Sequence, residues 1–430
     1  MPNPKKVLIV AYYWPPAGGP GVQRWLKFVK YLPDFGIKPI VYVPENPSYP
    51  ITDQDLWQEL PEGVQVIKRP IKEPYRFASM LSRKQTNAIS SGLVPKAKKQ
   101  SVMQKLLLYI RGNYFIPDAR VAWVKPSISY LEEILQQEEI NTIITTGPPH
   151  SMHLIGLGIK KRLPTIRWIA DFRDPWTTIG YHDQLKMTPK TQQKHKSMEL
   201  EVLQTADEII VTSPRTKLEF SEITKSPITV ITNGFDVPEN DKIELNNKFI
   251  ISHIGSLLSD RNPNLLWKVL AKILKKNYTF SEHLVICLAG RVSESVLMSL
   301  KQHNLDSYVQ LEGYVSHTTA IELQRKSNVL LLLEIDAPQN RSIIPGKLFE
   351  YLAARRPILA IGPKGSDIEE IIENTDSGSY HNYTEEEEIR KAILSHFTHF
   401  MNKSEELQSG EISKYHRRTL TETLSKSILS

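Results

Sequence analysis

Two residues at the start of one predicted helix, Lys347 and Glu350, could together bind a phosphate and a sugar. They lie in the stretch Ile343–Leu352, after an apolar run, Val329 to Leu333, that has the pattern of a buried strand. Residues at this spacing share one helix face, and a helix N-terminus offers free N–H groups and a positive dipole end. Lys347 would add a cation for a phosphate, and Glu350 could accept hydrogen bonds from sugar hydroxyls. A nucleotide-activated sugar needs this combination; the alternative is an amphipathic helix with surface charges.

Glycines and arginines follow other predicted strands in a similar way. Gly18 and Gly19 lie in the loop after the apolar run Lys6 to Val10. Open α/β sheets bind ligands at the carboxyl ends of their strands, so this loop is a candidate for binding an anion, although a plain tight turn would also explain it. The pair does not match the dinucleotide fingerprint, so no nicotinamide cofactor is expected.

The second half of the chain repeats this arrangement. Gly255 and Arg261 follow the strand predicted at Phe249 to Ile254, and Arg291 follows the one at Leu284 to Ala289. A glycine after a strand, an arginine in the loop and a helix start form a second candidate for binding an anion.

A third cluster is rich in polar side chains. Asp171, Arg173 and Asp174 follow the predicted strand at 167–170, and His150 follows the strand at 142–146. These groups could orient a hydroxyl acceptor, or they could hold one another in an ion network. A metal site is the weaker interpretation, because no histidine pattern accompanies the carboxylates.

Alternating strands and helices must position all these residues, which predicts an α/β fold. A chain of 430 residues exceeds what one core usually supports, so two domains are expected. We place the first at 1–240 and the second at 241–405, with a polar linker at 237–248. Residues 406–430 form a final segment containing a helix at 412–429.

Composition narrows the function class further. The net charge of +7 suits anionic small molecules or an anionic membrane surface, and no nucleic-acid-binding signature is present. The single cysteine, Cys287, fits a reducing compartment and a buried position. No signal peptide and no membrane-spanning run is predicted, so work at a membrane would be done from its surface. Basic residues around the apolar segment 102–110 could rest on a bilayer, or belong to a charged loop and a packed helix: Lys96, Lys98, Lys99, Lys105 and Arg111.

Several motifs in order along the chain resemble those of one family. The chain resembles GT-B-fold glycosyltransferases of the retaining family 4 type, also called glycosyltransferase group 1. The motifs that carry the resemblance are Pro16–Gly21, Ile231–Asp236, Gly255 with its loop, Leu288–Arg291, Leu311–Val315 and Lys347–Ala353.

The resemblance implies two Rossmann-like domains facing across a cleft, with the final helix returning to the first domain. Glu350 would bind the ribose and Arg261 the diphosphate of a nucleotide-sugar donor, with Gly18 and Gly19 approaching the phosphates. Asp171, Arg173, Asp174 and His150 would line the side of a glycan or lipid-linked acceptor. The implied reaction is hexosyl transfer with retention and without a metal or other cofactor. It would belong to polysaccharide or glycoconjugate synthesis in the cytoplasm, at the inner face of the membrane.

Two positions depart from the family pattern. Ser256 stands where a basic residue is usual, and Ser342 stands where a glutamate that contacts the donor sugar is usual. Arg291 or Lys347 could supply the missing charge, and Gln339 or Asn340 could contact the sugar. The departures keep two alternatives open: a GT-B-fold sugar-nucleotide epimerase, and a non-catalytic protein that binds sugar nucleotides.

Overall fold

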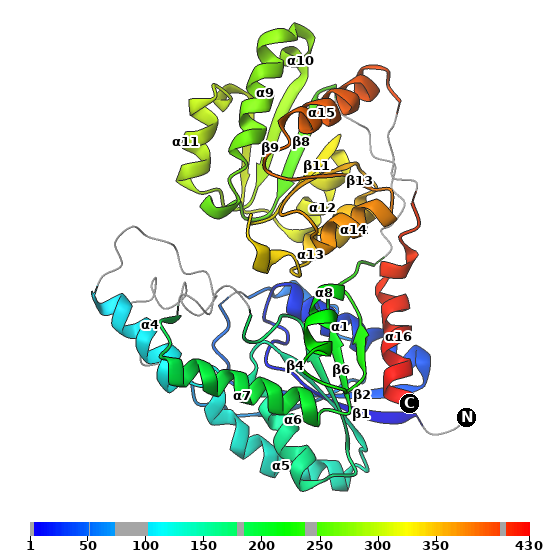
Figure 1. Ribbon diagram of the computed structural model, residues 1–430. Coiled ribbons are helices and arrows are strands. Elements are labelled where there is room, and N and C mark those ends of the chain that lie inside the picture. Colours follow the sequence, from blue (N-terminus) through cyan, green and yellow to red (C-terminus); the bar gives the residue numbers. More distant parts are fainter. Residues whose placement is uncertain (1–3, 51, 74–101, 179–184, 237–246, 405–409) are drawn as a thin grey trace. The chain divides into compact units, whose positions relative to one another are not determined.

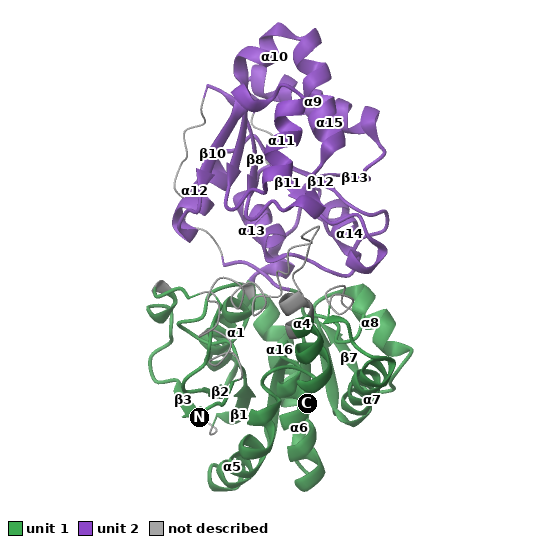
Figure 2. Cartoon of the chain, turned by 90° about the vertical axis from the view of Figure 1, so that its left-hand side faces the viewer, with its two compact units in different colours: residues 1–232, 417–430 green, residues 233–416 purple. Residues whose placement is uncertain are grey.

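The chain forms two compact units, each built around its own sheet (Figures 1 and 2). The computed structural model describes residues 4–50, 52–73, 102–178, 185–236, 247–404 and 410–430. Unit 1 comprises Met1–Thr232 and Arg417–Ser430, and unit 2 comprises Asn233–His416. The divisions therefore fall at 232/233 and 416/417, where the sequence placed them at 240/241 and 405/406.

Unit 1 contains a parallel sheet of seven strands in the order β3-β2-β1-β4-β5-β6-β7. The strands are β1 (Lys5–Val10), β2 (Ile37–Pro44), β3 (Gln65–Arg69), β4 (Thr142–Gly147), β5 (Arg167–Phe172), β6 (Glu208–Val211) and β7 (Ile228–Val230). The helices are α1 (Pro20–Tyr31), α4 (Val102–Tyr114), α5 (Val124–Gln137), α6 (Ser151–Arg162), α7 (Pro189–Thr205), α8 (Pro214–Ser221) and α16 (Arg417–Leu429). Short 3-10 turns are η1 (Leu32–Phe35), η2 (Asp55–Trp57) and η3 (Val121–Trp123).

Both faces of this sheet are covered by helices, because successive strand residues point to opposite faces and both sets are apolar. Leu8 and Val10 of β1 belong to a core that includes residues of α5, α6 and α7. Val7 and Ile9 belong to a second core that includes residues of α1 and α16. The predicted parallel, doubly covered sheet is confirmed.

Unit 2 contains a parallel sheet of six strands in the order β10-β9-β8-β11-β12-β13. The strands are β8 (Phe249–Ile254), β9 (Leu284–Ala289), β10 (Val309–Gly313), β11 (Val329–Leu333), β12 (Ile358–Ile361) and β13 (Gly378–His381). The helices are α9 (Asn264–Lys276), α10 (Tyr278–His283), α11 (Glu294–Gln302), α12 (His317–Lys326), α13 (Gly346–Ala354), α14 (Asp367–Asn374) and α15 (Glu386–Met401). The 3-10 turns are η5 (Ser259–Arg261), η6 (Asp306–Tyr308), η7 (Pro338–Asn340) and η8 (Ser413–Tyr415).

Helices also cover both faces of the unit 2 sheet. One core joins the sheet to residues of α9, α10, α11 and α15, and the other joins it to α13 and α14. Two parallel Rossmann-like sheets, of seven and six strands, are therefore present as predicted.

Some details differ from the predicted elements. The last helix begins at Arg417 rather than near Ile412, because Ser413–Tyr415 form a 3-10 turn that ends at His416 with extended backbone. Of the basic segment, Lys96, Lys98 and Lys99 lie outside the described residues. None of the helices that the structure describes is long and apolar enough to cross a membrane.

Candidate functional site

Each sheet has a switch point, where the strand order reverses, and the predicted binding loops lie there. In unit 2, β8 lies between β9 and β11, so the connections after β8 and β11 leave in opposite directions. Gly255 and Arg261 follow β8, and Lys347 opens α13 after β11. Ligands of open α/β sheets bind at such points, beyond the carboxyl ends of the strands.

Two glycines lie close together at the unit 2 switch point. Gly255 and Gly290 have φ angles of 122° and 108°, which side chains rarely adopt. A Cβ on Gly290 would lie 2.8 Å from the Gly255 carbonyl carbon, and a Cβ on Gly255 would lie 2.7 Å from Lys347 Nζ. The structure therefore brings Gly255, Gly290 and Lys347 together, with the lysine ammonium against glycine backbone.

A buried histidine, His253, lies beside this lysine. Its Nδ1 is 3.0 Å from the Leu331 carbonyl oxygen, and its Nε2 is 3.3 Å from Lys347 Nζ. Because a carbonyl only accepts, the ring proton is on Nδ1, and Nε2 is free to accept from the ammonium. Burial, followed by the charge of Lys347, holds the pKa of His253 well below its usual range, so the ring is neutral.

Burial also lowers the pKa of Lys347, to about 7, and the positive charge of Arg261 acts in the same direction. Arg261 is the last residue of η5, and its guanidinium is close enough to Lys347 to lower the pKa of that lysine. Its Nε is buried and has no hydrogen-bond partner among the described residues. Two cations thus converge on the switch point of unit 2, which is an arrangement suited to an anion with two phosphates.

A buried carboxylate, Glu334, lies at the end of β11 behind these cations. Ser366 Oγ donates to one of its oxygens at 2.9 Å, and Tyr380 Oη donates to the other at 2.6 Å. Burial raises the pKa of Glu334 to about 7, while the nearby Arg261 charge lowers it. Glu334 can therefore gain or lose a proton near neutral pH, next to the residue predicted to hold a diphosphate.

Glu350 lies on α13, partly buried, one turn after Lys347. Its carboxylate accepts from Gln324 Nε2 at 3.0 Å and lies 3.4 Å from His317 Nε2 on the neighbouring helix α12. Its charge also raises the pKa of Lys347, so the two predicted donor-binding side chains are close. These contacts orient the carboxylate, as binding of a hydroxyl pair requires.

Three other predicted donor residues are placed more loosely. The side chain of Arg291 is exposed, and its carbonyl oxygen accepts a hydrogen bond from Leu257 N. Gln339 and Asn340 lie on η7, and Ser342 lies between η7 and α13. The hypotheses that these residues supply charge or contact the sugar stay predictions.

In unit 1, Asp171 is fully buried at the end of β5. It accepts hydrogen bonds from Arg24 at 3.0 Å and from Trp25 Nε1 and Thr146 Oγ1 at 2.8 Å each. These contacts attach α1 to the carboxyl edge of the sheet. They correspond to the ion-network alternative for Asp171, and the carboxylate has no surface exposed to an acceptor.

Arg173, in contrast, reaches the first turn of α1, directly after the glycine-rich loop. Its guanidinium occupies the space where a side chain on Gly21 would be, since a Cβ there would lie 1.6 Å from Nη1. The same guanidinium donates to the backbone carbonyls of Gly147 and Pro148, in the loop after β4. Asp174 follows it, with a pKa that burial raises and the Arg173 charge lowers. The loops after β1, β4 and β5 therefore meet at Arg173, while Gly18 and Gly19 lie in the first of them with Gly19 preceding α1.

His150 lies in the β4 loop next to a second histidine. Its ring stacks on Trp176, with centroids 4.8 Å apart and planes at 4°. A Cβ on Gly147 would lie 2.5 Å from His153 Nε2 and 3.2 Å from His150 Nδ1. His153 is fully buried, lies 3.0 Å from Thr145 Oγ1 through Nδ1, and has a pKa lowered by burial to about 3. Both rings thus pack around the end of β4.

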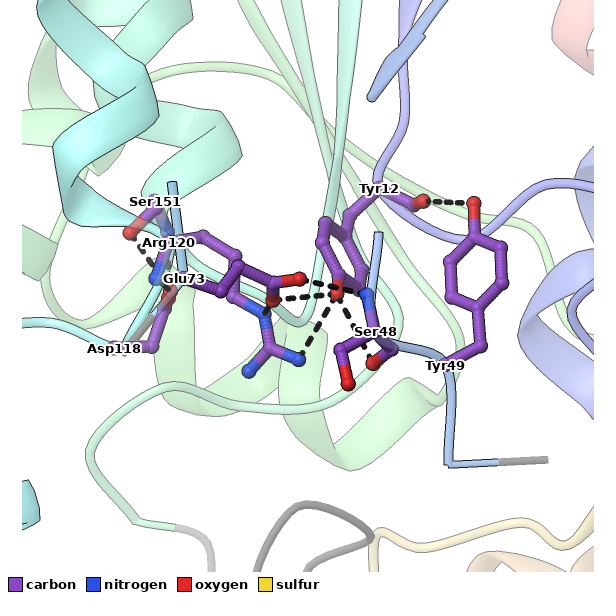
Figure 3. A network of polar contacts seen from close by, with 7 residues as sticks. All are labelled: Tyr12, Ser48, Tyr49, Glu73, Asp118, Arg120 and Ser151. Carbon is purple, nitrogen blue, oxygen red and sulfur yellow. Dashed lines mark hydrogen bonds and ion pairs between the residues drawn. The ribbon is translucent and has the colours of Figure 1, made fainter. Parts of the chain in front are cut away.

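A buried polar network holds the residues at the ends of two of these loops, Tyr12 and Ser151 (Figure 3). Glu73 accepts from Tyr12 Oη at 2.7 Å and pairs with Arg120 at 3.2 Å. Figure 3 also shows Asp118 accepting from both the backbone and the hydroxyl of Ser151, at 2.9 and 2.8 Å. The first residue of α6 and the start of the glycine-rich loop are in this way tied to one segment of chain, residues 118–120.

The fold of this chain is similar to that of several solved protein structures. No protein-family model matches the chain, and no curated protein matches its sequence. A glycosyltransferase from Rickettsia africae superposes with a TM-score of 0.63 at 14% identity, over 100% of this chain and 99% of that chain. HepE from Anabaena, solved in complex with UDP-glucose, superposes with a TM-score of 0.61 at 12% identity, over 99% of each chain. The chain has the GT-B fold. A protein from Listeria monocytogenes assigned as a UDP-N-acetylglucosamine 2-epimerase is also similar, with a TM-score of 0.54 at 11% identity, over 99% of this chain and 96% of that one.

Within this GT-B fold, the sequence identified the candidate loops but not several side chains that lie beside them. His253, Glu334, Arg24 and His153 were not predicted as part of a site. His253 lies in an apolar strand, and its only signal was a polar residue at a buried position. Among the residues that the structure describes, no group of three or more His, Cys, Asp or Glu side chains is placed to hold a metal ion.

Proposed function

We propose that this chain is a retaining glycosyltransferase that moves a hexosyl group from a nucleotide-diphosphate sugar to a glycan or lipid-linked acceptor. The observation that carries the proposal is the group at the switch point of unit 2. There the ammonium of Lys347 lies against the backbone of Gly255, Arg261 is close by, and Glu350 follows one turn later. These are the parts needed to bind a diphosphate and the hydroxyls of a ribose.

The cations have a chemical task beyond binding. As the bond from the anomeric carbon to the diphosphate breaks, negative charge develops on the leaving oxygens. Lys347 and Arg261 would stabilise that charge, with Arg291 as a further cation, and preorganised charges of this kind supply much of the rate enhancement in enzymes. We propose that the reaction proceeds with no metal or other cofactor, because these side chains provide the positive charge.

Unit 1 would bind the acceptor. Arg173, Asp174 and His150 lie at the carboxyl edge of its sheet, where the three loops meet, and Gly18 and Gly19 lie in the loop after β1. Asp171 would act through Arg24 and Trp25, by holding α1 in place, rather than by touching the acceptor.

A similar structure supports a role in the synthesis of surface saccharides. WaaG, described as involved in lipopolysaccharide biosynthesis, superposes with a TM-score of 0.54 at 10% identity over 98% of this chain and 99% of that one. We propose a role in polysaccharide or glycoconjugate synthesis, in the cytoplasm and at the inner face of the membrane.

The test compares variants of the donor site with surface controls. A thermal-shift screen first identifies the nucleotide sugar that stabilises the protein. Arg261→Ala and Glu350→Ala should then each slow transfer from that donor by at least about 10-fold, because a charged hydrogen bond contributes about 1.5–3 kcal/mol. The controls are Arg390→Ala and Glu387→Ala, which break an exposed ion pair on α15 and should leave transfer unchanged. Wild-type rates in both donor-site variants would contradict the proposal.

An epimerase is the second candidate, favoured by the similar Listeria structure. An epimerase would convert the nucleotide sugar with no acceptor present, whereas a transferase requires one. Incubation of the protein with the donor alone, followed by separation of the sugar nucleotides, distinguishes the two. Binding of the donor without turnover, across a panel of acceptors, would instead indicate a non-catalytic binding protein, the alternative that Ser342 raised.

A further inference from the structure

Unit 1 has a basic depression of about 630 Å³ that the proposed transfer reaction does not use. It lies where β3 ends and α5 begins. Three cationic side chains line it, Lys68, Arg69 and Lys72, and its other lining residues are aromatic, proline or alanine. No carboxylate is among the lining residues, so the charge of this hollow is positive throughout.

Among the described residues, no carboxylate neutralises these cations. Arg69 lies over the ring of Tyr130 at 4.7 Å, and Lys68 lies over the ring of Trp57 at 5.5 Å. Within the part of the chain that the structure describes, none of the three forms an ion pair with a carboxylate. Stacking on a ring leaves the hydrogen-bond donors at the edge of a guanidinium available, so Arg69 is both positioned and able to bind.

The nearest carboxylate along the chain, Glu73, is engaged elsewhere. It is buried in the network with Tyr12 and Arg120 and accepts from the backbone of Ser48 at 2.7 Å (Figure 3). Its charge is therefore matched by Arg120, although it directly follows Lys72. This pairing leaves the positive potential of the depression intact.

A buried donor lines the same depression. Trp123 is 1% exposed and stacks on Tyr42, with centroids 4.8 Å apart and planes at 7°. Its Nε1–H is buried and has no acceptor among the described residues, although an indole N–H can only donate. An unpaired buried donor is uncommon in folded proteins and calls for an acceptor from a ligand or water. The first turn of α5, beside Trp123, has no acidic residue and no side-chain cap, so its dipole adds to the positive potential.

From these observations we infer that the depression is an anion-binding site that takes the phosphate group of a phosphorylated saccharide or of a lipid headgroup. Its volume is in the range of small-molecule sites, and three separate cations suit the several oxygens of a phosphate. All its lining residues belong to unit 1, and none of them is among the residues assigned to the donor site. It also stands independently of sugar transfer, since a binding measurement needs no turnover.

The test has a soluble arm and a membrane arm, both on the full chain. Calorimetric titration with glycerol 3-phosphate measures binding of a soluble phosphate ester. Sedimentation with phosphatidylglycerol vesicles, compared with phosphatidylcholine vesicles, measures binding of a phosphate headgroup in a bilayer. The variant is Arg69→Gln with Lys72→Gln, and the matched control is Lys125→Gln, an exposed lysine on α5 that does not line the depression. Thermal unfolding checks that both variants fold.

The double variant should weaken binding by at least about 10-fold in one arm, because it removes two charged contacts. The control should stay within about 2-fold of wild type, since exposed charges outside the depression are screened by solvent. A loss confined to the soluble arm indicates a soluble phosphate ester, the class that includes phosphorylated saccharides, and a loss confined to vesicles indicates a lipid headgroup. Equal binding by the double variant and wild type in both arms, or no saturable binding by wild type in either, overturns the proposal.

Discussion

Lys347 is a cation placed where its charge is costly. Its ammonium lies against glycine backbone and the neutral ring of His253. Burial, followed by repulsion from Arg261, lowers its pKa to about 7. A bound diphosphate would reverse this effect, because an adjacent anion favours the charged form of a lysine. Binding of the donor should therefore be accompanied by uptake of a proton.

This linkage predicts how donor affinity depends on pH. In the free protein Lys347 loses its proton as the pH rises through about 7, while the bound form keeps it. The Kd for the nucleotide sugar should consequently rise above that pH, by up to about 10-fold per pH unit for one proton. Calorimetry at several pH values, in buffers of different ionisation enthalpy, measures both the affinity and the proton uptake.

The same range contains the pKa of Glu334, which is about 7 and whose ionisation would place a negative charge near Arg261. Two variants separate the groups. Lys347→Arg keeps its charge at all these pH values, so the steep part of the profile should disappear. Glu334→Gln should leave the Lys347 part in place. A profile that stays as steep in Lys347→Arg would assign the effect to another group.

At the residue scale, the sequence predicted the polar groups in loops better than those inside strands. Lys347 and the pair Gly255 and Arg261 were predicted as two anion-binding candidates from their places after predicted strands, and the family resemblance joined them in one donor site. The structure places the three residues close together. His253 could not be predicted, because its role depends on Lys347 folding back onto it from a segment far along the chain. Asp171 shows the opposite case, since only its three partners distinguish a network residue from an acceptor ligand.

At the scale of elements, the donor loop depends on close contact between the turns after β8 and β9. The backbone N–H of Gly290 donates to the carbonyl oxygen of Gly313, and a Cβ on Gly290 would lie 2.8 Å from the backbone of Gly255. Backbone at that distance cannot move aside without displacing the loop that carries the proposed diphosphate contacts.

Gly290→Ala should therefore impair both stability and donor binding. The φ angle of 108° alone costs about 1–3 kcal/mol for a residue with a side chain. The control is Gly313→Ala, whose φ is 66° and whose Cβ would meet nothing within 4 Å. It should cost about 1 kcal/mol of stability and leave the donor Kd unchanged. Denaturant unfolding and donor titration of both variants provide the comparison, and equal donor affinity in Gly290→Ala would show that the loop tolerates the displacement.

Long apolar strands were predictable because an apolar run in an α/β pattern indicates a strand covered on both faces. Two of the four edge strands, β3 and β13, were not predicted. None of the residues of β3 is fully buried, and β13 has a single large apolar residue, Tyr380. These two strands lack a long apolar run. They form because they pair with a neighbouring strand, β3 with β2 and β13 with β12.

At the scale of the whole molecule, unit 2 is an insertion in unit 1. The chain leaves unit 1 after Thr232 and returns to it at Arg417, so the last helix completes the core of the first unit. Leu420, Leu424 and Ile428 of α16 are buried in the core that includes Val7 and Ile9 of β1. Polar contacts add to this packing, since Lys5 Nζ donates to the carbonyl oxygen of Ile428 at 2.5 Å.

The closing helix should therefore control the stability of unit 1 specifically. Leu424 is 0% exposed, so Leu424→Ala leaves a cavity and should cost about 2–5 kcal/mol. Leu429→Ala is the matched control, because the side chain of Leu429 is 51% exposed and should contribute little. Hydrogen exchange read by mass spectrometry locates the effect. Leu424→Ala should speed exchange in β1 and β2 while leaving β8 and β11 unchanged, because the removed side chain packs only in the unit 1 core. Equal acceleration in both units would mean that they unfold together, and that α16 stabilises the chain as one cooperative body.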